Sequence, residues 1–78
     1  MRDLLDYILR NILGKDSKYE IEEVNEDSIV KLIIKTADDE GGMVIGKGGK
    51  VIKAIRNILR IKATLEKKKI ILLVNPVN

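Results

Sequence analysis

The chain has no cysteine, no histidine, no phenylalanine and no tryptophan among its 78 residues, and a single proline. Without cysteine it forms no disulfide, carries no thiolate nucleophile and offers no zinc–thiolate site. Without histidine it lacks the usual general base and the commonest nitrogen ligand for metals. The remaining acidic, hydroxyl and lysine side chains show no spacing that would unite them at one site. We therefore expect no enzyme, no metal site and no cofactor.

Long apolar runs are also absent. The longest, residues 70–74, is far shorter than a membrane span. Asp3 and Asp6 interrupt the N-terminal stretch that a signal peptide would keep apolar. We therefore expect a cytoplasmic protein without a membrane span. The length predicts one domain, residues 1–78, and the apolar content of 45% suffices for a core.

Charge is distributed unevenly along the chain, whose formal net charge is +3. Residues 16–40 contain nine acidic and three basic residues, whereas residues 41–78 contain nine basic residues and one acidic residue. A basic segment of this kind is the expected footprint of a polyanion-binding surface. A solvated, lysine-rich surface without a ligand is the alternative, because charge alone is weak evidence.

Hydrophobic periodicity in the first half predicts a helix followed by two strands. The helix has apolar residues at helical spacing over residues 4–13 and ends at Gly14. Residues 19–24 alternate as an edge strand does, and we expect this strand to end or bulge at its last residue, Val24. Turn-forming residues 25–28 then predict a hairpin that leads into a second strand over residues 29–36.

The second half predicts two helices and a last strand. A short helix is expected over residues 37–45 and a longer one over residues 50–65. Residues 70–74 lack alternation, which is typical of a strand that is buried on both faces or central in its sheet.

A glycine-rich loop, Gly46-Lys47-Gly48-Gly49, joins the two predicted helices. Glycine permits a positive φ angle or the close approach of another molecule. The loop precedes a helix N-terminus, where unpaired N–H groups and the helix dipole favour an anion. Lys50 and Lys53 extend the positive charge along the solvent side of that helix. These features predict binding of a phosphate or of a nucleic-acid backbone.

Three other interpretations of this loop compete. A nucleotide P-loop fits Gly41, Gly46 and Lys47, but Gly48 stands where the Mg²⁺-binding hydroxyl belongs. A dinucleotide fingerprint fails because Val51 replaces its last glycine and no βαβ unit surrounds it. A glycine turn between helices with no ligand explains Gly46 but gives Gly48 no role.

Residues 44–52, with the sequence VIGKGGKVI, resemble the core signature of KH domains, whose G-x-x-G loop clamps about four nucleotides between two helices. The element order is similar to the bacterial, type II arrangement. The length and the continuation IKAIR over residues 52–56 resemble the small single-KH-domain RNA-binding proteins of the bacterial KhpA family. Family members commonly place a bulky apolar residue at Gly41 and often a basic one at Met43.

The resemblance implies an α+β, type II KH fold of order α-β-β-α-α-β, in which three helices pack on one face of a three-stranded mixed sheet. It implies phosphate contacts at the loop and a shallow apolar groove for the bases beside it. For Ile45 and Ile52 an ordinary core role is an equal alternative, and for Ile33 the sequence leaves open whether its face is covered or available to a ligand. The RNA-binding residues expected on this basis are Ile33, Ile45, Gly46, Lys47, Gly48, Gly49, Lys50, Ile52 and Lys53.

The resemblance also implies partners. Single-stranded RNA is the expected ligand, with RNA-chaperone activity and a role in post-transcriptional regulation and in cell-envelope growth or division. Homodimers, and a heteromer with a larger KH-containing bacterial protein, are expected. From the residues themselves, Ala54, Ile61 and Leu65 widen the apolar arc of the long helix beyond what a small sheet covers. A protein-interaction module is therefore the alternative function.

Overall fold

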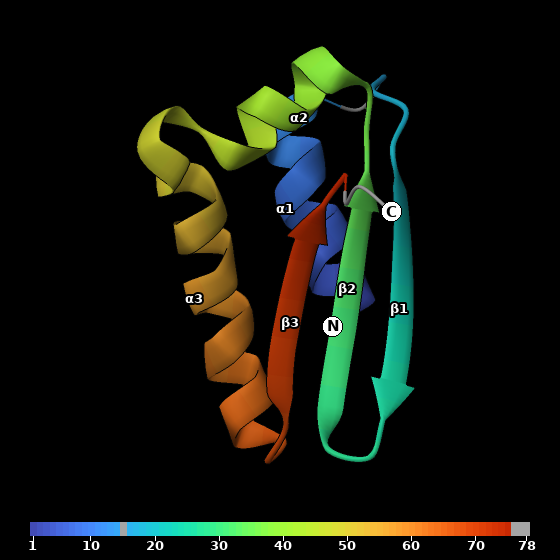
Figure 1. Ribbon diagram of the computed structural model, residues 1–78, viewed down its shortest axis with the longest axis vertical. Coiled ribbons are helices and arrows are strands. Elements are labelled where there is room, and N and C mark those ends of the chain that lie inside the picture. The colour runs from blue at the N-terminus through green and yellow to red at the C-terminus, as the bar shows by residue number, and fades with distance from the viewer. Residues whose placement is uncertain (15, 76–78) are drawn as a thin grey trace.

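The computed structural model describes residues 1–14 and 16–75, and at Asp38 and Asp39 the backbone alone. The elements occur in the predicted order (Figure 1): they are α1 (Arg2–Leu13), β1 (Glu20–Glu26), β2 (Ile29–Lys35), α2 (Asp38–Ile45), the 3₁₀ turn η1 (Lys47–Gly49), α3 (Lys50–Leu65) and β3 (Lys69–Val74).

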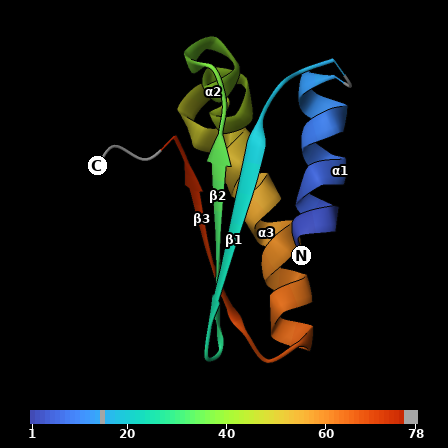
Figure 2. The same cartoon turned by 90° about the vertical axis from the view of Figure 1, so that its right-hand side faces the viewer.

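The three strands form one sheet in the order β1-β2-β3. β1 runs antiparallel to β2, and β3 runs parallel to β2 after the crossover through α3. The helices lie on one face of this sheet and leave the other face open (Figure 2). This arrangement matches the type II KH fold, so the predicted fold class is confirmed.

The core lies between the sheet and the helices. In β2, residues 30, 32 and 34 face the helices and are buried, because side chains alternate between the two faces of a strand. Leu5 and Leu9 are fully buried on α1, one helical turn apart. Other elements contribute Val44, Ile55, Leu59 and Leu72 to the same cluster.

The prediction that β1 ends or bulges at Val24 is wrong. The strand continues to Glu26 in unbroken register, and Val24 pairs with Lys31 on the open face of the sheet. Alternation is kept, because Glu23 takes the position on the helix side. It lies at the margin of the core, where its carboxylate is 4.0 Å from the amino group of Met1. Because Glu23 is charged although it lies on the side of the strand that faces the helices, the alternation was not visible in the sequence.

The prediction that the last strand is central or buried on both faces is also wrong. β3 lies at an edge of the sheet, and Ile71 on its open face is 43% exposed. Only the side of β3 that faces the helices follows the expected burial, with Leu72 beside Leu32. The edge position of the first strand, β1, is confirmed.

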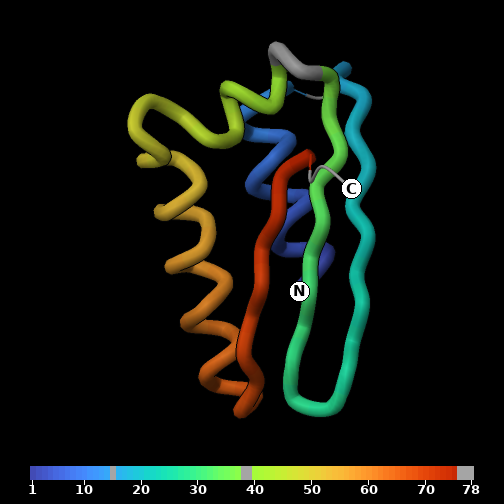
Figure 3. Tube along the Cα trace, viewed as in Figure 1, coloured from blue at the N-terminus to red at the C-terminus, as the bar shows by residue number. Residues whose placement is uncertain are grey.

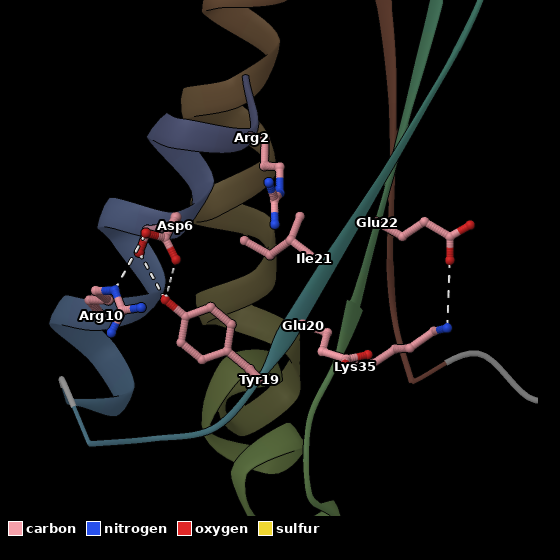
Figure 4. Close-up of a pocket in the computed structure, with 8 residues that line it drawn as sticks. All are labelled: Arg2, Asp6, Arg10, Tyr19, Glu20, Ile21, Glu22 and Lys35. Carbon is pink, nitrogen blue, oxygen red and sulfur yellow. Dashed lines mark hydrogen bonds and ion pairs between the residues drawn. The ribbon is translucent and has the colours of Figure 1, made fainter.

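Tyr19 fastens α1 to the start of β1 (Figure 4). Its hydroxyl donates to Asp6 Oδ1 at 2.6 Å, and the guanidinium of Arg10 lies 5.6 Å from its ring centre. Burial, together with this hydrogen bond, raises the pKa of Tyr19 to about 12. The same hydrogen bond lowers the pKa of Asp6. A polar pocket of about 410 Å³ lies here, with three acidic and three basic side chains in its wall.

Candidate nucleic-acid interface

The glycine loop forms the turn between α2 and α3, at the end of the molecule away from the β1–β2 turn (Figure 3). Gly46 ends α2 with φ 76° and ψ 168°, a combination that is essentially restricted to glycine. A β-carbon at Gly46 would collide with the side chain of Val51 in the first turn of α3. Its N–H donates to Gly42 O at 2.9 Å. Gly46 is therefore required by the backbone angles and by the close packing of the two helices.

Gly48 is under a different constraint. Its φ of 65° is positive, but no atom lies within 4 Å of where its β-carbon would be. Gly49, at φ 77°, meets only side-chain atoms at 3.9 Å there, and its N–H donates to Gly46 O at 3.0 Å. The turn is thus closed internally through Gly49, whereas the outer surface at Gly48 is open to an approaching molecule.

Positive charge surrounds the N-terminus of α3. Lys47, Lys50 and Lys53 are exposed, and within the described part of the chain none of them forms an ion pair. No acidic residue occupies the first turn of α3, and among the described residues no side chain caps it. Helix N-termini usually recruit a polar or acidic cap for their free N–H groups. At the N-terminus of α3, lysines take the place of such a cap, so the free N–H groups and the positive charge at this end of the helix favour an external anion.

The structure places the three apolar residues that were predicted beside the loop in three different environments. Ile45 is 41% exposed at the end of α2. Ile52 is partly buried and packs against the core cluster. Ile33 does not join them, because it lies on the open face of β2, beside Leu73 of β3. β3, rather than β2, is the strand beside α3, so Ile33 lies apart from Ile45 and Ile52.

The end of β3 and the residue after it lie against α2. The side chain of Asn75 reaches Gly41 of α2, and Val74 packs against the core beside it. The sequence carries no local signal for this proximity, since it depends on the order of strands in the sheet. α2 is also fixed from the other side, where Ser17 Oγ donates to Glu40 Oε1 at 3.1 Å.

A second surface lies on the outer side of α3. Ile58, Ile61 and Leu65 are 46%, 66% and 80% exposed, and their spacing places them on one stripe of the helix. Ala54 continues this outer stripe toward the loop. Exposed apolar stripes of this kind mark interaction sites.

The fold, with its G-x-x-G turn between two helices beside an edge strand, defines a KH domain of type II. The family model for the KH domain of KhpA and KhpB matches residues 2–74, and the chain belongs to this family.

Curated relatives extend this finding. The chain is 31% identical to the RNA-binding protein KhpA of Clostridium acetobutylicum over 91% of its length and 95% of the relative. It is 32% identical to the protein of that name from Chlamydia trachomatis, over 90% of both chains. Over 76% of both chains it is 36% identical to that of Chlamydia caviae. No solved structure matches the chain significantly.

The described residues lack two further features. None of the helices there has the length and apolarity that crossing a bilayer demands. No group of three or more acidic, histidine or cysteine side chains in that part of the chain is placed to hold a metal ion.

Proposed function

We propose that this protein binds single-stranded RNA and holds its backbone at the loop between α2 and α3. The observation that carries the proposal is the open, lysine-flanked turn at Gly48, set on an uncapped helix N-terminus. Family membership supports the ligand, because the curated relatives are named as RNA-binding proteins.

In the proposed complex, phosphates approach the backbone at Gly48 because no side chain stands in the way. Lys47, Lys50 and Lys53 neutralise them, with the partial positive charge of the α3 N-terminus. These contacts position the RNA without reading its sequence. Bases lie in a shallow apolar groove beside the loop, with Ile45 and Ile52 as its floor and the β3 edge as its wall. The lack of Phe and Trp disfavours recognition by aromatic stacking platforms.

The wider role is proposed from the family resemblance. Residues 1–78 act as one RNA-binding domain in the cytoplasm, as an RNA chaperone without enzymatic activity and without a cofactor. The proposal includes post-transcriptional regulation linked to cell-envelope growth or division.

Replacing Lys47 and Gly48 by aspartates tests the site. The double variant K47D/G48D adds two negative charges and removes one positive charge, a net change of −3 at the loop, and we expect it to fold because both positions are exposed and Gly48 faces open space. In a gel shift with single-stranded RNA we expect no retained complex. Wild-type retention by this variant would refute the site.

A charge-matched control lies at the other end of α3. Thr64 and Lys67 are exposed there, and T64D/K67D changes the net charge by the same amount. The two sites are separated by roughly 24 Å along the helix, beyond the screening distance of about 8 Å at physiological salt. We expect this control to retain RNA nearly as the wild type does. An equal loss in both variants would point to a general charge effect and not to a loop site.

A second candidate function is self-association through the outer stripe of α3, supported by the exposure of Ile58, Ile61 and Leu65. We propose a homodimer, or a heteromer with a larger KH-containing bacterial protein, that covers this stripe. Ile61 is outside the core cluster, so I61D tests the stripe without emptying the core. Sedimentation at several concentrations should show association for the wild type and for I61L, and a monomer for I61D. A concentration-independent wild type would refute the homodimer.

A further inference from the structure

Helix α2 carries the loop, although its own residues support it poorly. It has eight residues, of which two are glycines, and its N-cap residue is Ala37, whose side chain provides no cap. Such a helix depends on contacts from the rest of the molecule to hold its position. The structure supplies one at the β2–α2 junction, from a residue far away in the sequence.

That residue is Asn75, directly after β3. Its Oδ1 accepts a hydrogen bond from the N–H of Thr36 at 2.7 Å, and its Nδ2 donates to Thr36 Oγ1 at 2.9 Å. The Thr36 hydroxyl in turn donates to Ala37 O at 3.0 Å, next to the start of α2. The backbone N–H of Asn75 donates to Ile34 O at 2.8 Å. The end of β3 is thus tied to the segment that leads into α2.

The same carboxamide explains the glycine at position 41. Gly41 is buried, and a β-carbon there would lie 2.7 Å from Asn75 Nδ2 and 3.2 Å from Thr36 Oγ1. The first separation is shorter than real β-carbon contacts, and Asn75 cannot swing away without losing both of its hydrogen bonds. Gly41 therefore leaves room for Asn75, and the two residues form one packing unit with Thr36.

We propose that Asn75 is a positioning residue for RNA binding. It is hydrogen-bonded to Thr36 and occupies the space next to Gly41, and in this way it holds α2 and the glycine loop in place against β3. This inference rests on the proposed RNA-binding function of the loop. Both polar ends of the carboxamide are engaged within the protein at the β2–α2 junction, so the proposed role of Asn75 is to act through α2.

The test begins with N75G. Asn75 has φ 44°, which glycine adopts freely, so this variant removes the carboxamide without straining the backbone. Loss of two ordinary hydrogen bonds shifts a conformational equilibrium on the order of tenfold. Apparent RNA affinity falls in proportion to the fraction of molecules that keep the competent arrangement, which is nearly the same factor when that arrangement is only weakly favoured, as the poor intrinsic support of α2 indicates. We expect about tenfold weaker binding of a labelled random-sequence single-stranded RNA pool, measured by fluorescence anisotropy.

Hydrogen exchange separates positioning from general destabilisation. In free N75G the amides of residues 41–49 should exchange faster, while those of the β1–β2 hairpin stay as in the wild type. A folded N75G that binds RNA with wild-type affinity, or whose exchange rises uniformly, overturns the proposal. If the wild type itself binds no RNA, the proposed function fails, and the exchange experiment still decides whether the hydrogen bonds between Asn75 and Thr36 hold α2 in place.

Two further comparisons keep the test sharp if N75G folds poorly. G41A should weaken RNA binding in the wild-type background, where its methyl group displaces the carboxamide. In the N75G background it should strengthen binding, because the carboxamide is gone, only the Thr36 hydroxyl remains near the β-carbon, at 3.2 Å, and alanine favours the helix. T36V loses the bond that the Thr36 hydroxyl accepts from Asn75 Nδ2 and the bond that it donates to Ala37 O, so it should weaken binding about tenfold, as N75G does. T36S keeps the hydroxyl and should not weaken binding. An equal effect of G41A in both backgrounds contradicts the proposal.

Discussion

Two turns of this protein reverse the chain at positive φ angles and are built differently. In the hairpin turn between β1 and β2, Asp27 takes φ 51°. The loop between α2 and α3 takes its positive angles entirely at glycines. Lys67 and Asn75 adopt positive φ elsewhere, so this chain does not need glycine at every such position. The loop glycines therefore have a further cause.

The cause differs between Gly46 and Gly48. At Gly46 it is internal, because the backbone angles and the side chain of Val51 leave no room for a β-carbon. At Gly48 the molecule itself imposes no such limit. The flanking charge differs as well, with glutamates along β1 and lysines beside the loop. The comparison separates a turn that only connects two strands from a loop whose surface is kept clear for a ligand.

The largest effect is expected at Gly46. G46A combines a backbone region that only glycine occupies with a collision against Val51, which together should lower the free energy of unfolding by about 3 kcal/mol. Urea denaturation monitored by circular dichroism measures it. A loss below about 1 kcal/mol would mean that the α2–α3 junction yields easily, and that Gly46 is not fixed by packing.

The two turns can be compared directly with G48A and D27A. Each places alanine at a positive φ in open surroundings, so each should cost about 1 kcal/mol of stability. Only G48A should weaken RNA binding, because its methyl group stands where a phosphate approaches. Denaturation and RNA titration of both variants provide the check. Equal RNA affinities would remove the distinction between the turns.

The contribution of the lysines near the loop can be compared with that of the lysines on β2 through the salt dependence of RNA affinity. K50Q/K53Q removes two cations near the loop, and K31Q/K35Q removes two from β2. The slope of log affinity against log salt should become shallower by about 1.4 for the first pair, because each phosphate contact in a single strand contributes about 0.7. The second pair should leave the slope unchanged. A change of slope for the β2 pair alone would place the RNA on the hairpin.

The smallest effect is expected on the side away from the loop. The raised pKa of Tyr19 stabilises the fold below pH 10, and that contribution is lost as pH rises toward about 12. The lowered pKa of Asp6 stabilises it above 3.8, and that contribution is lost in stronger acid. The stability difference between wild type and Y19F should therefore be largest between these limits and shrink on both sides.

Y19F should leave RNA affinity unchanged, since Tyr19 lies at α1 and β1. Denaturation curves across pH, with an RNA titration at neutral pH, measure both quantities. A stability difference that stays constant through acid and alkali would show that the Tyr19–Asp6 hydrogen bond does not cause the shifts.

The sequence was most informative where a pattern is local. The helix predicted from apolar spacing over residues 4–13 is α1, where Leu5 and Leu9 are fully buried. The strand predicted over residues 29–36 is β2, where residues 30, 32 and 34 are buried. The position of the glycine turn between two helices also followed from residues 44–52. In each case neighbouring residues alone determine which side chains share a face.

Apart from the end of β1, where Glu23 obscured the alternation, the errors concern relations that no local pattern carries. Residues 70–74 are uniformly apolar although β3 is an edge strand, because its open face retains partly exposed side chains such as Ile71. Ile33, expected beside the loop, lies on the open face of the sheet. The contact between Asn75 and Gly41 joins residues far apart in the sequence, so the glycine at position 41 had no visible reason before the structure supplied one.

RNA contact at the loop and the first turn of α3 can be tested most directly by amide chemical-shift mapping during titration with single-stranded RNA. We expect the largest shifts at Gly46–Lys53, little change along β1, and no shifts at the loop in K47D/G48D. Largest shifts along β1 or at the far end of α3 would contradict it.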